Sequence, residues 1–184
     1  MFLRILTGIL ALAGGLGAIS ASAQTHRAGA LAPGPVLITL DGQYRFLNKL
    51  YYEGPARPAD PKAVVVLNFM GVDCPPCRKE LPLFLDAVRG NGTNRAAFRF
   101  FLVSTDPLSR KEDLRSFLKG VGVNPETEVL LDPYHKAADA FGVSSIPRTF
   151  VIAPDGRIVA DLSGISEEYF ARLTNGIQAA FGSP

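Results

Sequence analysis

Apolar and polar positions divide the chain into short segments with different patterns. Residues 63–70, AVVVLNFM, are β-branched and almost continuously apolar, which is typical of a strand covered on both faces. The next segment, residues 75–88, has apolar positions that suit a helix packed on a sheet. These positions are Leu81, Leu83, Phe84, Leu85 and Val88. One strand of the core therefore passes almost directly into a helix.

Strands and helices continue to alternate toward the end of the chain. We predict strands at residues 98–104, 128–132, 148–152 and 157–162, and helices at residues 110–118, 134–141 and about 167–180. Near the start, residues 36–47 indicate a β-hairpin that turns at Asp41-Gly42. The Pro and Gly residues of segment 51–62 indicate a loop. This order predicts an α/β fold, a three-layer α/β/α sandwich with a mixed central sheet and an N-terminal β-hairpin.

The first 23 residues have the pattern of a secretory signal. Arg4 precedes an apolar run from Ile5 to Ile19, and Ala21-Ser22-Ala23 forms a small-residue cleavage site. The apolar run is short for a helix that crosses about 30 Å of hydrocarbon. We therefore predict cleavage after Ala23 and export to the periplasm, with retention as a membrane anchor as the alternative. Residues 24–34 are predicted to be a flexible segment, and residues 35–184 a single domain.

The distribution of charge argues against one class of partner. The chain has 19 Lys and Arg residues against 17 Asp and Glu residues. Because these charges are interspersed rather than clustered, we expect no surface for nucleic acid or for an anionic membrane. The function has to be sought in the chemistry of particular side chains.

The two cysteines of the chain, Cys74 and Cys77, lie in the stretch MGVDCPPCRKELP, between the predicted strand and the predicted helix. As a structural cross-link the pair is weak, since closing such a short loop contributes about 2 kcal/mol, against roughly 3 to 5 kcal/mol for long loops. A closed zinc site needs more ligands, and the chain has only His26 and His135 to add. A reactive pair is the third possibility.

The position of the pair at a helix start favours reactivity. There the first thiol faces unpaired backbone N–H groups and the positive end of the helix dipole, which favours its thiolate form. The second thiol, one turn further along, is placed to attack a mixed disulfide formed by the first. Pro75 and Pro76 lack an N–H group and have a fixed φ, which suits a first helical turn. The spacing thus permits attack by Cys74 and resolution by Cys77.

Several separated features together resemble the thioredoxin superfamily, and within it the exported TlpA/ResA-like thiol-disulfide oxidoreductases, or redoxins. VVVLNF leads into CPPCRKELP, FGVSSIPRTFVIAPDGRIV follows, and a helix ends the chain. The resemblance covers residues from about 35 to 180. It implies a thioredoxin-like fold and a protein-disulfide reductase that uses no cofactor and no metal.

The resemblance also assigns roles to residues around the cysteine pair. It implies that Cys74 is the exposed nucleophile, that Cys77 is the buried resolving thiol, and that the two form a redox-active disulfide. Pro82 matches a proline that bends the active-site helix. Ile146-Pro147 matches a cis peptide bond opposite the sulfurs, where Ile146 offers main-chain groups to an extended substrate. An ordinary trans proline that opens an edge strand is the alternative for Pro147.

Two polar residues are placed near the resolving thiol by the same resemblance. Cytosolic thioredoxins have a buried aspartate at the position of Asn68, whereas the TlpA/ResA-like group commonly has asparagine there and an acid three residues after the second cysteine. Here that acid is Glu80, which on a helix lies within a turn of Cys77. A partly buried carboxylate with a raised pKa would exchange protons near neutral pH. A solvated surface charge is the alternative.

Two residues depart from the family pattern. Asp73 precedes the first cysteine, where the family usually has tryptophan, and the chain contains no tryptophan. Its carboxylate would raise the pKa of Cys74 unless Arg148 or Arg78 offsets the charge. Alternatively, Asp73 caps the helix and points to solvent. Arg148 follows the expected cis-proline and indicates an acidic segment in the partner, or is a simple surface charge.

Two other functions remain as alternatives. Copper delivery would use Cys74, Cys77 and His135, because thiolates and imidazole suit copper. Cleavage after Ala23 would also leave His26 third from a free amine, an arrangement that binds Cu(II). Peroxide reduction is the other alternative, although peroxiredoxins normally have threonine three residues before the nucleophile, where this chain has Gly71.

We therefore expect an exported thiol-disulfide oxidoreductase that mainly reduces disulfides in periplasmic proteins. The resemblance implies apocytochrome c or another maturation client as substrate. It also implies a membrane thiol reductant as the electron donor that keeps the pair reduced. Whether such a pair reduces or oxidises its partners depends on its reduction potential.

Overall fold

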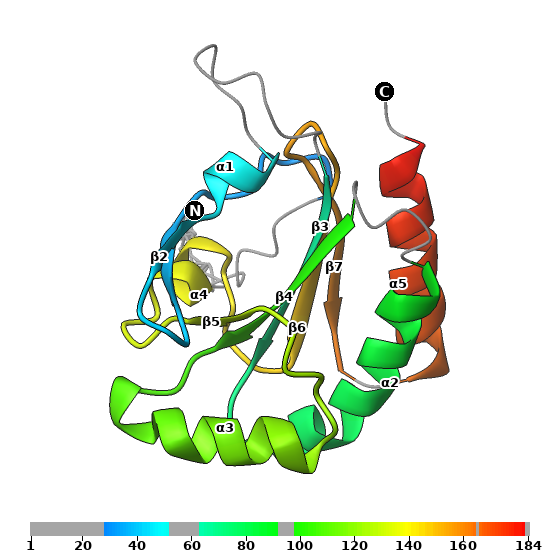
Figure 1. Cartoon of the computed structure of the whole chain (residues 1–184). Helices are drawn as coiled ribbons and strands as arrows, with labels where there is room; N and C mark the ends of the chain where they lie inside the picture. The colour runs from blue at the N-terminus through cyan, green and yellow to red at the C-terminus, as the bar shows by residue number, and fades with distance from the viewer. Residues whose placement is uncertain (1–27, 52–62, 92–97, 165, 183–184) are drawn as a thin grey trace, which may run out of the picture.

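The computed structural model describes residues 28–51, 63–91, 98–164 and 166–182. In these residues seven strands form one mixed sheet, and helices cover both of its faces (Figure 1). The strands are β1 (Val36–Thr39), β2 (Tyr44–Phe46), β3 (Val64–Met70), β4 (Phe98–Ser104), β5 (Val129–Leu131), β6 (Arg148–Ile152) and β7 (Ile158–Ser163). The helices are α1 (Asn48–Tyr51), α2 (Pro75–Asn91), the 3₁₀ helix η2 (Leu108–Arg110), α3 (Lys111–Gly120), α4 (Lys136–Ala140) and α5 (Glu167–Phe181). The predicted three-layer sandwich is confirmed.

The strand order in the sheet is β2-β1-β5-β4-β3-β6-β7. Strands β3, β4 and β5 are parallel, because α2 and α3 carry the chain back across the sheet between them. The β1–β2 and β6–β7 pairs are antiparallel, and the first of them is the predicted N-terminal hairpin. The turn between β6 and β7 contains Gly156 with a φ of 85°, a backbone conformation that glycine adopts without steric cost.

Strand β3 is buried along its whole length, which explains its nearly continuous apolar sequence. Successive side chains of a strand point to opposite faces, so its residues divide into two alternating sets. One set belongs to the apolar cluster that includes α2, α3 and α5, and the other to the cluster that includes α4. The two sets are Val64, Val66 and Met70, and Val65, Leu67 and Phe69. The prediction of a strand covered on both faces is confirmed.

Helix α2 extends from the cysteine pair through Pro82 to Asn91, somewhat further than predicted. The short helix α1 was not predicted from the sequence. Among the described residues, no helix has the length and apolar character needed to cross a membrane. The predicted signal, residues 1–23, lies outside the residues described.

Part of the predicted flexible segment pairs with the domain. Leu31 forms an isolated antiparallel bridge with Arg157, which follows the turn between β6 and β7. The N–H group of Gly29 donates to the carbonyl of Ile158 at 2.8 Å, and that of Ala32 to the carbonyl of Gly156 at 2.8 Å. The regular backbone pairing therefore begins before residue 35, and the domain boundaries themselves stay predictions.

Candidate functional site

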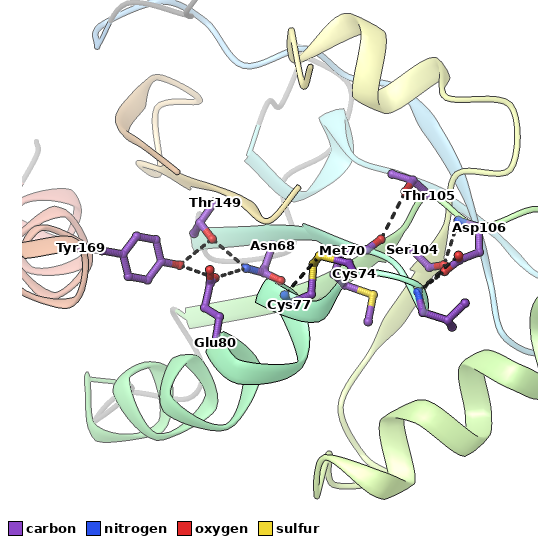
Figure 2. The surroundings of a disulfide bond; sticks show 11 residues. Asn68, Met70, Cys74, Cys77, Glu80, Ser104, Thr105, Asp106, Thr149 and Tyr169 are labelled. Carbon is purple, nitrogen blue, oxygen red and sulfur yellow. Dashed lines mark hydrogen bonds between the residues drawn. A yellow bond between two sulfur atoms is a disulfide. The ribbon is translucent and has the colours of Figure 1, made fainter. Parts of the chain in front are cut away.

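The two cysteines lie where β3 passes into α2. Cys74 ends the turn of residues 71–74, which we call the cysteine turn, and Cys77 lies in the first turn of α2. Cys74 and Cys77 form a disulfide with their Cα atoms 5.2 Å apart, as the resemblance implied (Figure 2). Cys74 exposes 6% of its surface and Cys77 exposes 1%. The expectation of an exposed Cys74 is thus wrong for this oxidised form, since both cysteines belong to the apolar cluster beneath α2, against which Ile146 also packs.

The start of α2 directs a backbone donor at the first sulfur. The N–H group of Cys77 donates to Sγ of Cys74 at 3.1 Å. Pro75 is the first helical residue, so Cys74 occupies the position that caps the helix N-terminus. Both the N–H group and the helix dipole favour negative charge on this sulfur when the pair is reduced.

A carboxylate from the neighbouring strand holds the cysteine turn in place. Asp106, just after β4, accepts a hydrogen bond from the N–H group of Val72 at 3.0 Å and from the hydroxyl of Ser104 at 2.8 Å. The N–H group of Thr105 donates to the carbonyl of Met70 at 3.0 Å (Figure 2). Asp106 was not predicted from the sequence. Its position could have indicated its role. Asp106 follows β4, a strand parallel to β3, and the carboxyl ends of neighbouring parallel strands lie at the same edge of the sheet.

Glu80 is buried, with 1% of its surface exposed, so the alternative of a solvated charge is wrong. Its Oε1 atom accepts a hydrogen bond from the amide of Asn68 at 2.9 Å and another from the hydroxyl of Tyr169 at 2.8 Å. The hydroxyl of Thr149 lies 2.8 Å from both the Asn68 amide nitrogen and the Tyr169 oxygen. In the view of Figure 2, these residues lead from Tyr169 through Glu80 and Asn68 to the cysteines.

Burial controls the protonation of this carboxyl group. It raises the pKa of Glu80 from 4.5 to about 7, against the hydrogen bonds from Tyr169 and Asn68, which lower it. Burial also raises the pKa of Tyr169, so its phenol stays protonated and remains a donor. Asn68 and Glu80 were predicted from the sequence, whereas Thr149 of β6 and Tyr169 of α5 were not. Tyr169 contacts the carboxyl group directly, and Thr149 forms hydrogen bonds with Asn68 and Tyr169.

The charge of Asp73 is offset by an arginine that was not predicted from the sequence. Arg110, in η2, donates to the two carboxylate oxygens of Asp73 at 2.7 and 3.3 Å. These hydrogen bonds and the positive charge hold the pKa of Asp73 below its usual value. Arg78 instead lies over the ring of Phe117, 4.7 Å from its centroid. The expectation that Arg78 or Arg148 neutralises Asp73 is therefore wrong.

Arg148 is paired on the other side of the site. Its guanidinium group donates to the two oxygens of Asp161 at 2.5 and 2.8 Å, and both side chains are largely buried. This pairing removes the argument for an acidic segment in the partner, because the charge of Arg148 is already balanced. The preceding Ile146-Pro147 peptide bond is cis, so the trans alternative is wrong. The substrate-binding role of Ile146 and Pro147 stays a prediction.

The donors of the copper alternative are not brought together. His135 is exposed and precedes α4, where its φ of 55° places it in the left-handed region. Within the part of the chain that the structure describes, no group of three or more His, Cys, Asp or Glu side chains is placed to hold a metal ion. His26, the donor of the second copper arrangement, lies outside the described residues.

Comparisons with known proteins place the chain in a family. Residues 54–161 match the AhpC/TSA family. The thiol-disulfide oxidoreductase ResA of Bacillus subtilis is 31% identical over 82% of this chain and 75% of its own length. The thiol:disulfide interchange protein HelX of Rhodobacter capsulatus is 28% identical over 64% of this chain and 63% of its own length.

Solved structures agree with this relationship. A putative protein disulfide isomerase from Bacteroides thetaiotaomicron, 26% identical, superposes with a TM-score of 0.69 over 85% of this chain and 91% of its own. A putative thiol:disulfide interchange protein DsbE from Chlorobium tepidum, 24% identical, has a TM-score of 0.65 over 85% and 99% of the two chains and supports the fold alone. The chain therefore belongs to the AhpC/TSA family of redoxins and is a thiol-disulfide oxidoreductase with a thioredoxin-like fold.

Proposed function

We propose that the protein reduces disulfides in exported client proteins, with Cys74 as nucleophile and Cys77 as resolving thiol. The observation that carries this proposal is the hydrogen bond from the Cys77 N–H group to Sγ of Cys74. It marks the first sulfur as the one whose anion the helix start stabilises. The lower exposure of Cys77 fits a thiol that attacks only within the protein.

Electrons and sulfur atoms balance in two steps. In the reduced protein, the Cys74 thiolate attacks one sulfur of the client disulfide, forms a mixed disulfide and releases a client thiolate. The Cys77 thiolate then attacks Sγ of Cys74, forms the Cys74–Cys77 disulfide and releases the second client thiolate. Two electrons pass to the client, and each released thiolate takes up a proton. A thiol reductant must afterwards reduce the pair again.

Glu80 is proposed to exchange the proton of Cys77. The carboxyl group is buried within one helical turn of that cysteine, and its pKa of about 7 allows both protonation states near neutral pH. Asn68 lies between the two groups in the view of Figure 2. An amide at this position keeps the carboxyl group oriented while adding no charge of its own.

Export and clients belong to the same proposal. The N-terminal pattern supports cleavage after Ala23 and a periplasmic location. Relatives named as thiol-disulfide oxidoreductases and thiol:disulfide interchange proteins support disulfide-bonded proteins as clients. Among these we propose exported proteins such as apocytochrome c, with a membrane thiol reductant as electron donor. Intact-mass analysis of the mature protein tests the cleavage site directly.

Peroxide reduction is less well supported by the packing of the cysteine turn. A Cβ atom at Gly71 would lie 3.1 Å from Cδ1 of Ile146 and 3.5 Å from an Asp106 oxygen. The threonine that peroxiredoxins normally have at this position would therefore require Ile146 to move. Rapid consumption of hydrogen peroxide by the reduced protein would overturn the preference for disulfides as substrate.

Reduction of insulin disulfides by the pre-reduced protein tests the assigned roles. We expect Cys74→Ala to abolish the reaction, whereas Cys77→Ala should still attack insulin but stop at a stable mixed disulfide, visible by mass spectrometry. Equal activity of Cys74→Ala and the unaltered protein would refute the mechanism. The direction of electron flow follows from equilibration with glutathione. A potential near about −270 mV or lower supports a reductase, and one near about −120 mV points to an oxidase.

A further inference from the structure

Four polar side chains from four different elements form one buried hydrogen-bond network beside the disulfide (Figure 2). They are Asn68 of β3, Glu80 of α2, Thr149 of β6 and Tyr169 of α5. Each of them exposes 4% of its surface or less. Among their polar atoms, only Oδ1 of Asn68 and Oε2 of Glu80 are buried without a hydrogen-bond partner among the described residues. The remaining contacts join donors and acceptors of known type, so the hydrogen atoms they share can be assigned one by one.

The amide of Asn68 fixes the direction of the network. Its nitrogen can only donate, and it does so to Oε1 of Glu80 at 2.9 Å and to the hydroxyl oxygen of Thr149 at 2.8 Å. Tyr169 donates its single hydroxyl hydrogen to the same Oε1 atom at 2.8 Å. The contact of 2.8 Å between Thr149 and Tyr169 is then made by the Thr149 hydrogen. When Glu80 is ionised, two chains of hydrogen bonds therefore lead from Asn68 to Oε1. One is the direct bond, and the other passes through Thr149 and Tyr169.

The two oxygens of Glu80 consequently differ. Oε1 accepts two hydrogen bonds, while Oε2 is buried and has no partner among the described residues. Protonation at Oε2 leaves every hydrogen bond of the network intact. We propose that Tyr169 is a positioning residue for Glu80: its hydroxyl group, oriented by Thr149, stabilises the ionised carboxylate at Oε1 and leaves Oε2 to take up and release the proton. This inference rests on the proposed role of Glu80 in proton transfer.

The position of Tyr169 is set by the start of α5. The side chain of Ser166 caps this helix and accepts a hydrogen bond from the N–H group of Tyr169 at 3.0 Å. The Tyr169 ring packs edge-on against Phe170, with centroids 4.8 Å apart, within the apolar cluster beneath α2 and α5. The hydroxyl group is therefore held toward α2 by a capped helix and a packed ring, rather than by a flexible loop.

Removal of this hydroxyl group should change the titration of Glu80 in one direction. The hydrogen bond from Tyr169 lowers the pKa of Glu80, so its loss raises that pKa above about 7. Two groups contact the carboxyl group, Asn68 from β3 and Tyr169 from α5, and Thr149 from β6 forms hydrogen bonds with both of them. None of them carries a charge near neutral pH, and the neighbouring Arg148 is paired with Asp161. The change in the pKa of Glu80 can therefore be attributed to the loss of the Tyr169 hydroxyl group.

The experiment is a carbon-13 NMR titration of the Glu80 carboxyl group in the full, oxidised protein. The resonance is assigned as the one that disappears in Glu80→Gln. In Tyr169→Phe we expect the midpoint to rise by about one pH unit, because a hydrogen bond to a charged group is worth about a factor of ten. Tyr134→Phe is the matched control, since Tyr134 is 71% exposed, and it should leave the midpoint unchanged.

Thr149 supplies a second test that does not require the Tyr169 variant to fold. Thr149→Val removes the hydrogen that orients Tyr169, so the midpoint should rise by a smaller amount, and Thr149→Ser, which keeps the hydroxyl group, should restore it. An unchanged or lowered midpoint in Tyr169→Phe overturns the inference. If that variant does not fold, an unchanged midpoint in Thr149→Val overturns it.

Failure of the proposed function gives a different result, because the titration uses the oxidised protein and needs no client. The second readout starts from the reduced protein and insulin. It is the pH dependence of the rate at which Cys77 releases insulin from the mixed disulfide with Cys74. If the carboxyl midpoint rises in Tyr169→Phe but the release profile does not follow it, Tyr169 positions Glu80 as proposed and the proton-transfer role of Glu80 is refuted. If both move together, both proposals are supported.

Discussion

Substitution of Glu80 by glutamine should make the folded protein more stable at alkaline pH. The folded state holds this carboxyl group at a pKa of about 7 instead of 4.5, because burial disfavours the charged form. Below pH 4.5 the carboxyl group is protonated in both the folded and the unfolded chain. Between pH 4.5 and about 7 only the unfolded chain loses the proton, so stability falls as pH rises through this range.

The size of the effect follows from the two pKa values. Since one pKa unit corresponds to about 1.4 kcal/mol, ionised Glu80 lowers the free energy of unfolding by about 3 kcal/mol above pH 7, as an order of magnitude. Glutamine resembles the protonated acid in shape and is uncharged, because an NH2 group takes the place of the OH group. That group would stand at the Oε2 position, where the carboxyl oxygen has no partner among the described residues. The two proteins should thus be similarly stable near pH 4.5, and Glu80→Gln should be the more stable at pH 8.

Urea unfolding of the oxidised proteins at pH 5 and pH 8 measures this difference. With an m value of about 2 kcal/mol/M, a change of about 3 kcal/mol moves the midpoint by about 1.5 M. Glu112→Gln is the control, because the side chain of Glu112 is 85% exposed and its substitution should show no such dependence on pH. If the stability difference between Glu80→Gln and the unaltered protein is the same at both pH values, Glu80 does not titrate as the structure indicates.

Two further predictions concern the surroundings of the site. Arg110→Gln leaves the charge of Asp73 unbalanced beside Cys74, so alkylation of the reduced protein by iodoacetamide near pH 7 should slow by about two- to threefold, from Coulomb repulsion across roughly 7 Å of water. Asp73→Asn combined with Arg110→Gln should restore the rate, and an unchanged rate in the single variant would show that the pair does not act on the cysteine. Ser166→Ala removes the cap of α5 and should lower the free energy of unfolding by about 1 kcal/mol in urea, whereas Ser109→Ala, at an exposed position, should change little.

The sequence was sufficient where local patterns decide the structure. The apolar run of β3, the proline pair at the start of α2 and the Asp41-Gly42 turn between β1 and β2 all predicted elements that are present. Contacts between distant segments were harder to predict. Helical spacing placed Glu80 near Cys77, but the hydroxyl group that donates to its carboxylate belongs to Tyr169, which lies 89 residues further along the chain.

The partner of Asp73 shows the same limit. The expected partners, Arg78 and Arg148, lie close in sequence to the cysteines or to the cis-proline, whereas the actual partner, Arg110, is 37 residues from Asp73 in sequence. It reaches Asp73 because η2 follows β4, whose carboxyl end lies beside that of β3 in the parallel sheet. Which charged side chain meets the turn depends on the path of the loop after β4, and no local pattern encodes that path.

The bridge between Leu31 and Arg157 has a consequence for how the molecule is presented to its clients. Strand β6 runs antiparallel to β3, with Arg148 opposite Phe69 and Ile152 opposite Val65, so the turn after β6 lies at the far end of the sheet from the disulfide (Figure 1). Residues 29–32, among the first that the structure describes, therefore lie at that far end. A tether or affinity tag attached at these residues would hold the domain at the end opposite the disulfide, so that the cysteine turn would face away from the point of attachment.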